Sequence, residues 1–270
     1  MKKFLAMAMA VAMTLSLASC GAKGDASSTA SGSNGTNAPA TVEEGKLIVS
    51  TNAEFPPYEF MADDGSFKGI DIEVAGLIAD KMGLELQVDN MGFTQCLEAV
   101  QNGRSDMALA GVTVTEDRLV NMDFSNSYAT GVQVVIVPEG SPIETPDDLA
   151  NASLIGVQEG TTGYIFCSAA PEDGGYGEDH VMAYEDGAVA IQALLAGKID
   201  CIVIDNEPAK AYVAANPGLK ILDTAFAVED YAIALKKGNT EMADSVNTIL
   251  AELIADGSVQ QVIDKYIKAN

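Results

Sequence analysis

One basic residue occupies an unusual place in a predicted helix. The segment 106–111 is typical of a buried strand, and the next helix is predicted to start after Thr115, a residue type that suits the N-cap. Arg118 is then the third helical residue, where the positive end of the helix dipole disfavours a cation by roughly 0.3–1 kcal/mol. We therefore expect an anion nearby, supplied either by Glu116 or Asp117 at the surface or by a ligand.

A repeated segment supplies a second charged residue. Residues 98–111 match residues 192–205, and each copy predicts a helix that ends at a glycine, a turn with a basic residue and an aspartate, and an apolar strand. The repeat places Gly111 and Asp205 at equivalent positions after their strands. Ligands of open α/β sheets lie beyond the carboxyl ends of the strands. Gly111, Thr113 and Arg118 from one copy and Asp205 from the other are therefore candidate site residues.

A third loop, 157–163, follows a predicted strand and opens a helix near Thr162, so its free amide groups predict a small anion site. These amides and Arg118 could hold a carboxylate, while Asp205 could hold an ammonium. Each feature also has a structural explanation. Asp205 would suit the N-cap of the next helix, the glycine loop lacks the lysine of a P-loop and suits an ordinary turn, and Phe55 and Phe93 suit a core.

Strands and helices alternate from residue 46 onward, which predicts an α/β fold. Strands are expected at 47–51, 84–89, 107–110, 154–157 and 201–204, and helices at 70–82, 93–101, 187–195 and from Thr162. Two further strands, at 128–137 and 231–235, are expected to cross between lobes and form a hinge. The sequence thus predicts two Rossmann-like α/β lobes joined by two crossing strands, with lobe 1 in 46–130 and 231–270 and lobe 2 in 134–227.

The N-terminal region differs in composition from the rest. Residues 1–20 combine two lysines with an apolar run that ends at Leu17-Ala-Ser-Cys20, which predicts a signal peptide, with a retained signal anchor as the alternative. The ending resembles the lipobox of bacterial lipoproteins, in which the cysteine, here Cys20, is lipidated. Residues 21–45 are mostly small and polar and predict a flexible linker. We expect the protein to act at the extracellular face of the cell membrane, held by a lipid anchor.

Composition excludes several other classes of function. The chain has 270 residues, of which 48% are hydrophobic, enough for two modest cores. A net charge of −24 without a basic stripe argues against a nucleic-acid partner. Cys96, Cys167 and Cys201 lack the paired spacing of a zinc site and His180 stands alone, so we expect no metal and no cofactor. Buried free thiols are expected, and a Cys167–Cys201 disulfide stays open.

These segments together resemble the bacterial extracellular solute-binding proteins that supply polar amino acids to ABC importers. The most specific segments are 51–60 (TNAEFPPYEF), 69–73 (GIDIE), 110–118 (AGVTVTEDR) with 123–125 (DFS), and 160–163 (GTTG), within a likeness that spans residues 46–266. The resemblance implies a periplasmic-binding-protein-like fold of type II and a polar amino acid held between the lobes and delivered to a membrane permease. We expect a monomer.

The resemblance also implies a role for each site residue. Arg118 is expected to bind the α-carboxylate of the ligand with Thr113 and the amide of Thr162, while Asp205 and the carbonyl of Gly111 bind its α-ammonium.

The ligand side chain is expected between Phe55 and Phe93. Glu54 and Gln158 are the polar candidates that would recognise it, although Glu54 would also suit an exposed position. Some cation-binding relatives carry aspartate where this chain has Asn52. Arginine-like and neutral polar ligands therefore both stay open.

Two other functions use the same sequence features. A receptor that reports amino acids to a signalling partner would look the same. A dehydratase on this scaffold would need a general acid or base, for which Glu54 and Glu159 are candidates. The sequence offers no nucleophile–base pair and no metal set, so we expect a binding protein and no enzyme.

Overall fold

The computed structural model describes residues 39–268. The predicted signal peptide, Cys20 and most of the predicted linker lie outside the described residues. Within residues 39–268, no helix is both long enough and apolar enough to cross a membrane.

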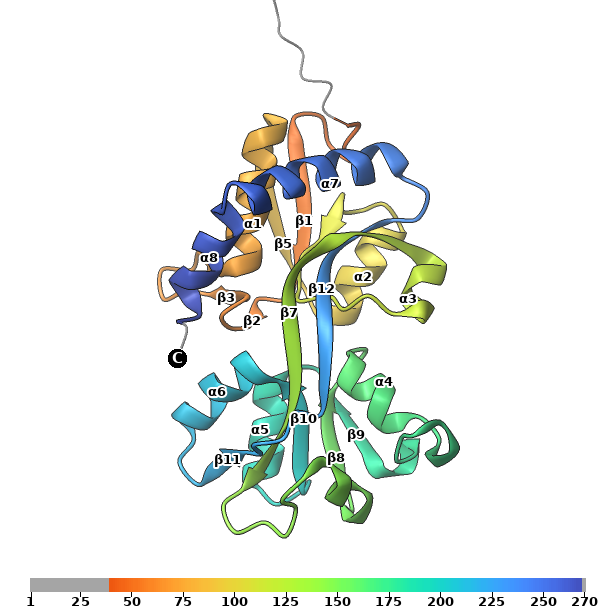
Figure 1. The fold of residues 1–270 in the computed structure, drawn as a ribbon, viewed down its shortest axis with the longest axis vertical. Helices are drawn as coiled ribbons and strands as arrows, with labels where there is room; N and C mark the ends of the chain where they lie inside the picture. The colour runs from red at the N-terminus through yellow and green to blue at the C-terminus, as the bar shows by residue number, and fades with distance from the viewer. Residues whose placement is uncertain (1–38, 269–270) are drawn as a thin grey trace, which may run out of the picture. The chain divides into compact units, whose positions relative to one another are not determined.

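Two groups of elements pack around separate cores, and we call them lobe 1 and lobe 2 (Figure 1). Lobe 1 holds β1 (Lys46–Thr51), β2 (Glu54–Phe55), β3 (Glu59–Met61), β4 (Phe67–Lys68), α1 (Ile70–Met82), β5 (Glu85–Asn90), α2 (Phe93–Gln101), β6 (Met107–Ala108), α3 (Glu116–Asn121), α7 (Thr240–Ala255) and α8 (Ser258–Tyr266). Lobe 2 holds β8 (Ile155–Gln158), α4 (Thr162–Ser168), β9 (Val181–Tyr184), α5 (Gly187–Leu195), β10 (Cys201–Asp205), α6 (Asn206–Ala215) and β11 (Leu219–Ile221), with short 3-10 helices at Pro146–Asn151, Pro171–Asp173 and Glu178–His180.

Two long strands run through both lobes (Figure 1): β7 (Met122–Pro138) and β12 (Ala227–Lys236). They pair antiparallel with each other, and β12 also pairs with β6 of lobe 1 while β7 pairs with β10 and β11 of lobe 2. The strand order is β5-β1-β6-β12-β7-β10-β8-β9, with β11 beside β7, and β2, β3 and β4 form a separate small sheet. The predicted fold of two α/β lobes joined by crossing strands is confirmed.

The cores explain why the chain returns to lobe 1 after building lobe 2. Val246 and Leu250 of α7 are fully buried against Ile78 of α1 and the strands β1 and β6. In lobe 2, helices cover both faces of the sheet, so β7 buries neighbouring residues on opposite sides. Val134 packs in one cluster and Val135 in the other, as the alternation of side chains along a strand requires.

The repeat that was predicted from the sequence has the same geometry in both lobes. Gly103 and Gly197 follow the ends of α2 and α5 with φ angles of 67° and 66°, and their N–H groups bond carbonyls of the preceding turn at 3.0 Å. Asp106 accepts a hydrogen bond of 2.7 Å from a backbone N–H of β1, and Asp200 accepts one of 2.6 Å from the backbone just before β8. Each aspartate therefore fixes the start of a neighbouring strand.

The structure departs from the predicted elements in a few places. The strand expected at 107–110 is confined to Met107–Ala108, because the chain turns away toward Gly111, whose φ is 55°. The first crossing strand starts at Met122, directly after α3, and not at residue 128. Cys96, Cys167 and Cys201 are buried free thiols, so the open possibility of a Cys167–Cys201 disulfide is wrong.

Candidate ligand-binding site

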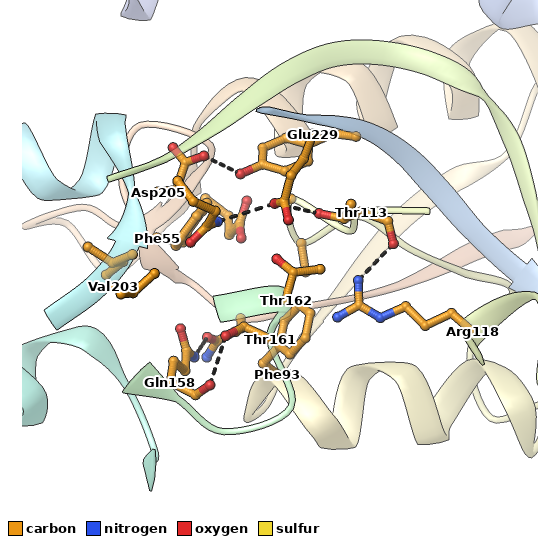
Figure 2. A pocket seen from close by; sticks show the side chains of 17 residues that line it. Phe55, Phe93, Thr113, Arg118, Gln158, Thr161, Thr162, Val203, Asp205 and Glu229 are labelled. Carbon is orange, nitrogen blue, oxygen red and sulfur yellow. Dashed lines mark hydrogen bonds between the residues drawn. The ribbon is translucent and has the colours of Figure 1, made fainter. Parts of the chain in front are cut away.

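A pocket is lined by residues of both lobes and of the crossing strand β12 (Figure 2). Nine of the residues proposed from the sequence line it: Asn52, Phe55, Phe93, Gly111, Thr113, Arg118, Gln158, Thr162 and Asp205. They lie at the ends of β2, β8 and β10, in the loops after β1 and β6, and in the first turns of α2, α3 and α4. The sequence predicted a site at such strand ends.

Arg118 is buried and is not paired with its neighbours in the helix. Thr115 caps α3 and accepts a hydrogen bond of 3.2 Å from the backbone N–H of Arg118, as predicted. The side chain is only 7% exposed. Its Nη1 donates to the carbonyl of Thr113 at 2.7 Å, its Nη2 donates to the carbonyl of Gly160 in lobe 2 at 3.0 Å, and the guanidinium lies 5.4 Å from the centre of the Phe93 ring. The alternative of a surface charge balanced by Glu116 or Asp117 is therefore wrong.

Arg118 forms no direct ion pair with the described residues around it. Within residues 39–268 no carboxylate forms an ion pair with it, and the two groups that it contacts are neutral carbonyls. Burial lowers the pKa of the guanidinium to about 10, and the nearby Glu229 carboxylate partly offsets this effect. A buried cation that remains charged at neutral pH attracts an anion into the pocket.

Asp205 caps a helix and also lines the pocket. It is 1% exposed and caps α6, because its Oδ1 accepts from the N–H of Glu207 at 3.1 Å. Its Oδ2 accepts from the hydroxyl of Tyr231 and from the N–H of Val132 at 3.1 Å. Burial raises the pKa of Asp205 to about 6, although these hydrogen bonds favour its ionised form. The predicted capping role and the predicted position in the site are both present.

Contacts with Asp71 and Phe55 fix the shape of the loop after β6. Gly111 donates its N–H to Oδ2 of Asp71 at 2.9 Å. A Cβ at Gly111 would lie 3.0 Å from the Phe55 ring, so this position admits only glycine without a shift. Thr113 follows at 8% exposure, and its hydroxyl donates to Glu229 at 3.0 Å. The loop thus places a glycine and a hydroxyl beside Arg118.

The loop after β8 brings a second set of polar groups from lobe 2. Thr161 caps α4, because its hydroxyl oxygen accepts a hydrogen bond of 3.4 Å from the N–H of Tyr164. Thr162 begins the helix and is 3% exposed. Gly160 has a φ of 74° and turns its carbonyl toward Arg118.

The two polar residues proposed to recognise a ligand side chain join the lobes to each other. Gln158 donates to Oδ1 of Asn52 at 3.0 Å and to the carbonyl of Glu185 at 3.2 Å, and Asn52 donates to the carbonyl of Met91 at 3.1 Å. Both side chains are 7% exposed. Their amides are therefore held in place where the pocket meets the lobe interface.

The aromatic residues belong to the core and to the pocket together. Phe93 is 8% exposed and packs with the apolar residues of α2. Phe55 contacts the cores of both lobes. Glu54 is different, because its side chain is exposed and does not line the pocket, while its carbonyl accepts a hydrogen bond of 3.2 Å from Tyr212 of lobe 2.

Eight further lining residues were not among the proposed site residues: Glu59, Ala110, Gln133, Thr161, Val203, Ile204, Glu229 and Tyr231. Strand alternation in the sequence could have indicated Glu229. Strand alternation puts it on the same inward face as Tyr231, and a predicted strand that began two residues earlier would have included it. Glu59 follows Pro57-Tyr58 with no periodic pattern, and its burial arises from distant contacts.

Two carboxyls lie together below the pocket. Glu59 and Asp71 are both 0% exposed, and Asp71 accepts hydrogen bonds from Tyr128 at 2.7 Å and from Gly111. Burial and the adjacent Asp71 raise the pKa of Glu59 well above its usual range, which favours its neutral form. Arg118, Asp205 and Glu229 line the pocket as well.

Comparison with known proteins places the chain in a family. The sequence model of the bacterial extracellular solute-binding proteins, family 3, matches residues 47–269. The chain belongs to this family. It is 31% identical to the L-cystine-binding protein TcyJ of Escherichia coli, over 84% of this chain and 85% of that protein. It is 27% identical to the arginine-binding extracellular protein ArtP of Bacillus subtilis, over 98% of each.

A solved structure extends the likeness to three dimensions. An ancestral arginine-binding protein bound to arginine superimposes with a TM-score of 0.76 at 35% identity, over 83% of this chain and 98% of that one. The fold is therefore that of the type II periplasmic binding proteins, and these relatives are named as binding proteins.

Proposed function

We propose that this family member captures a polar α-amino acid in the pocket between its lobes and delivers it to the permease of an ABC importer. The observation that carries the proposal is the pairing of opposite charges in one buried pocket: Arg118 from lobe 1 and Asp205 from lobe 2. An α-amino acid presents a carboxylate and an ammonium one carbon apart, and the pocket offers one group for each.

In this proposal Arg118 binds the α-carboxylate through the N–H donors that remain after its bonds to the carbonyls of Thr113 and Gly160, with Thr113 and the amide of Thr162 beside it. Asp205 and the carbonyl of Gly111 bind the α-ammonium. Charge-assisted hydrogen bonds contribute roughly 1.5–3 kcal/mol each. Several such bonds, offset by ordering and desolvation, are consistent with micromolar affinity, which corresponds to about −8 kcal/mol.

The ligand side chain is proposed to lie between Phe55 and Phe93 and to meet the amides of Asn52 and Gln158 at its far end. The relatives are named for arginine and cystine, which extend polar groups well beyond the α-carbon. Glu54 is placed outside the pocket and has no role in this proposal.

A thermal-shift screen with the twenty common amino acids tests the function. A ligand that binds only the folded state stabilises it by about 2.7 kcal/mol at one hundred times its Kd. We expect one or a few polar amino acids to raise the melting temperature and apolar ones to have no effect. A screen in which no amino acid shifts the transition would contradict the proposal.

The proposed setting is the outer face of the cell membrane. Cleavage between Ser19 and Cys20 would leave Cys20 as a lipid-bearing N-terminus, and residues 21–45 would serve as a linker to the monomeric two-lobed body. Residues 46–130 and 231–270 would form lobe 1, and residues 134–227 lobe 2. Membrane fractionation of cells that express Cys20→Ala tests the anchor, because this variant should leave the membrane fraction.

A further inference from the structure

The proposed function gives no role to Glu229, a buried carboxyl side chain of the pocket. Glu229 projects from β12 into the group of side chains in Figure 2 and is 6% exposed. Its Oε2 accepts two hydrogen bonds, from the Thr113 hydroxyl at 3.0 Å and from Nε2 of Gln133 at 3.2 Å. Its Oε1 is buried, and no donor among the described residues reaches it.

The hydrogen bonds that Arg118 and the Tyr231 hydroxyl donate among the described residues go to groups other than Glu229. Arg118 directs its two hydrogen bonds at the carbonyls of Thr113 and Gly160, and the Tyr231 hydroxyl donates to Asp205. Arg118 is the one cation among the residues that line the pocket, and it forms no ion pair with Glu229 within the described part of the chain. A buried carboxylate oxygen at the wall of a pocket is available to accept a donor from a ligand.

Asp205 alone offers little room for an ammonium. Its Oδ2 already accepts from Tyr231 and Val132, and its Oδ1 accepts from Glu207. One acceptor site therefore remains at Oδ1, whereas an ammonium carries three N–H donors. Oε1 of Glu229 and the Gly111 carbonyl would supply the other two.

We propose that Glu229 is a second carboxylate acceptor for the α-ammonium of the ligand, so that two carboxylates bind the ammonium while one guanidinium binds the carboxylate. This inference rests on the proposed function. It predicts that the site discriminates strongly against acids that lack the amino group, because such a ligand would leave Oε1 buried without a partner and would add a second anion beside it.

The test compares an amino acid with its deamino counterpart. The probes are the amino acid that most stabilises the wild-type protein and the same acid without its α-amino group; for L-arginine this is 5-guanidinopentanoate, and for L-glutamine it is glutaramate. Glu229→Gln keeps the shape of the side chain but removes its charge. We expect it to weaken amino-acid binding by about tenfold or more and to leave binding of the deamino acid unchanged or improved.

Two variants serve as controls. Asp230→Asn removes a carboxylate from the adjacent, exposed position of β12 and should leave both affinities unchanged. Glu229→Asp keeps the charge and should retain a preference for the amino acid, while the melting temperature of each ligand-free variant reports whether it folds.

Equal losses for the amino acid and the deamino acid in Glu229→Gln would overturn the inference and leave Glu229 as a positioning residue for Thr113. Unchanged amino-acid affinity would also overturn it. A wild-type protein that binds no amino acid would contradict the proposed function itself, which is a separate outcome.

Discussion

At the scale of single residues, the site joins groups that are costly to bury. Asp205 is 1% exposed and has a pKa near 6, above its ordinary value of 3.8 because of burial. An ionised Asp205 at pH 7 therefore destabilises the ligand-free fold while it prepares the site for an ammonium. This is the trade between stability and function that buried binding groups commonly show.

Replacement of Asp205 by asparagine should separate the two effects. Asparagine still caps a helix and carries no charge, but its single oxygen replaces only one of the two acceptor oxygens that Asp205 uses. These effects oppose each other, so we expect Asp205→Asn to change the free energy of unfolding at pH 7 by no more than about 1–2 kcal/mol. Amino-acid binding should weaken by about a hundredfold. Chemical denaturation and calorimetry check both values, and a variant that binds normally would remove Asp205 from the ammonium site.

The residue scale also shows where the sequence was sufficient. Arg118 and Asp205 were found because helix capping and strand ends follow local rules. Glu59 could not be predicted as a site residue, because its burial depends on the fold. The groups around it belong to α1 and to the pocket, and no local sequence pattern indicates these contacts.

At the scale of elements, the crossing strands do more than connect the lobes. β12 carries Tyr231 and Glu229 into the pocket, and β7 lies against it so closely that Gly131 has no room for a side chain. A Cβ at Gly131 would lie 2.4 Å from the ring of Tyr231. The absence of a side chain there allows the Tyr231 hydroxyl to reach Asp205.

Substitution of Gly131 by alanine should therefore displace Tyr231. We expect Gly131→Ala to lower the free energy of unfolding by about 1–3 kcal/mol through overpacking and to weaken amino-acid binding. Gly76→Ala is the matched control, since Gly76 lies within α1 with open space around it and alanine there should stabilise by up to about 1 kcal/mol. Equal melting temperatures for the two variants would contradict this account of the hinge.

Helices at 70–82, 93–101 and 187–195 were predicted with the bounds that the structure shows. Their apolar patterns and flanking glycines are local signals. Strand starts were less certain, because a strand is defined by its partners, and the late start predicted for β12 is the reason that Glu229 was missed.

At the scale of the whole molecule, the two lobes meet through hydrogen bonds that no local pattern announces. Asn52 with Gln158, Arg118 with Gly160 and Glu54 with Tyr212 each join the lobes. The partners are far apart in the chain, so the sequence indicated Asn52, Gln158, Arg118 and the Gly160 loop as parts of the site but could not pair them, and it gave no role to Tyr212.

Buried acids should give binding and stability opposite pH dependences. Asp205 and Asp71 have pKa values of about 6 in the folded state and lower values when unfolded. The folded state therefore holds more protons between about pH 4 and 6, and the stability of the ligand-free protein should fall as pH rises through this range.

Amino-acid affinity should rise through the same range, because Asp205 must be ionised to bind an ammonium. Calorimetry at pH 5 and pH 7.5 measures the change, and Asp205→Asn should remove most of it. Affinity that falls as pH rises would contradict the assignment.

The central claim is that Arg118 binds the carboxylate of an amino acid inside the cleft. The most direct measurement is isothermal titration calorimetry of the amino acid selected by the thermal-shift screen against wild-type protein, Arg118→Ala and Arg104→Ala. Arg104 is the only other arginine of the chain and is exposed. We expect micromolar binding for wild type and Arg104→Ala, and no measurable binding for a folded Arg118→Ala. Unchanged affinity in Arg118→Ala would contradict it.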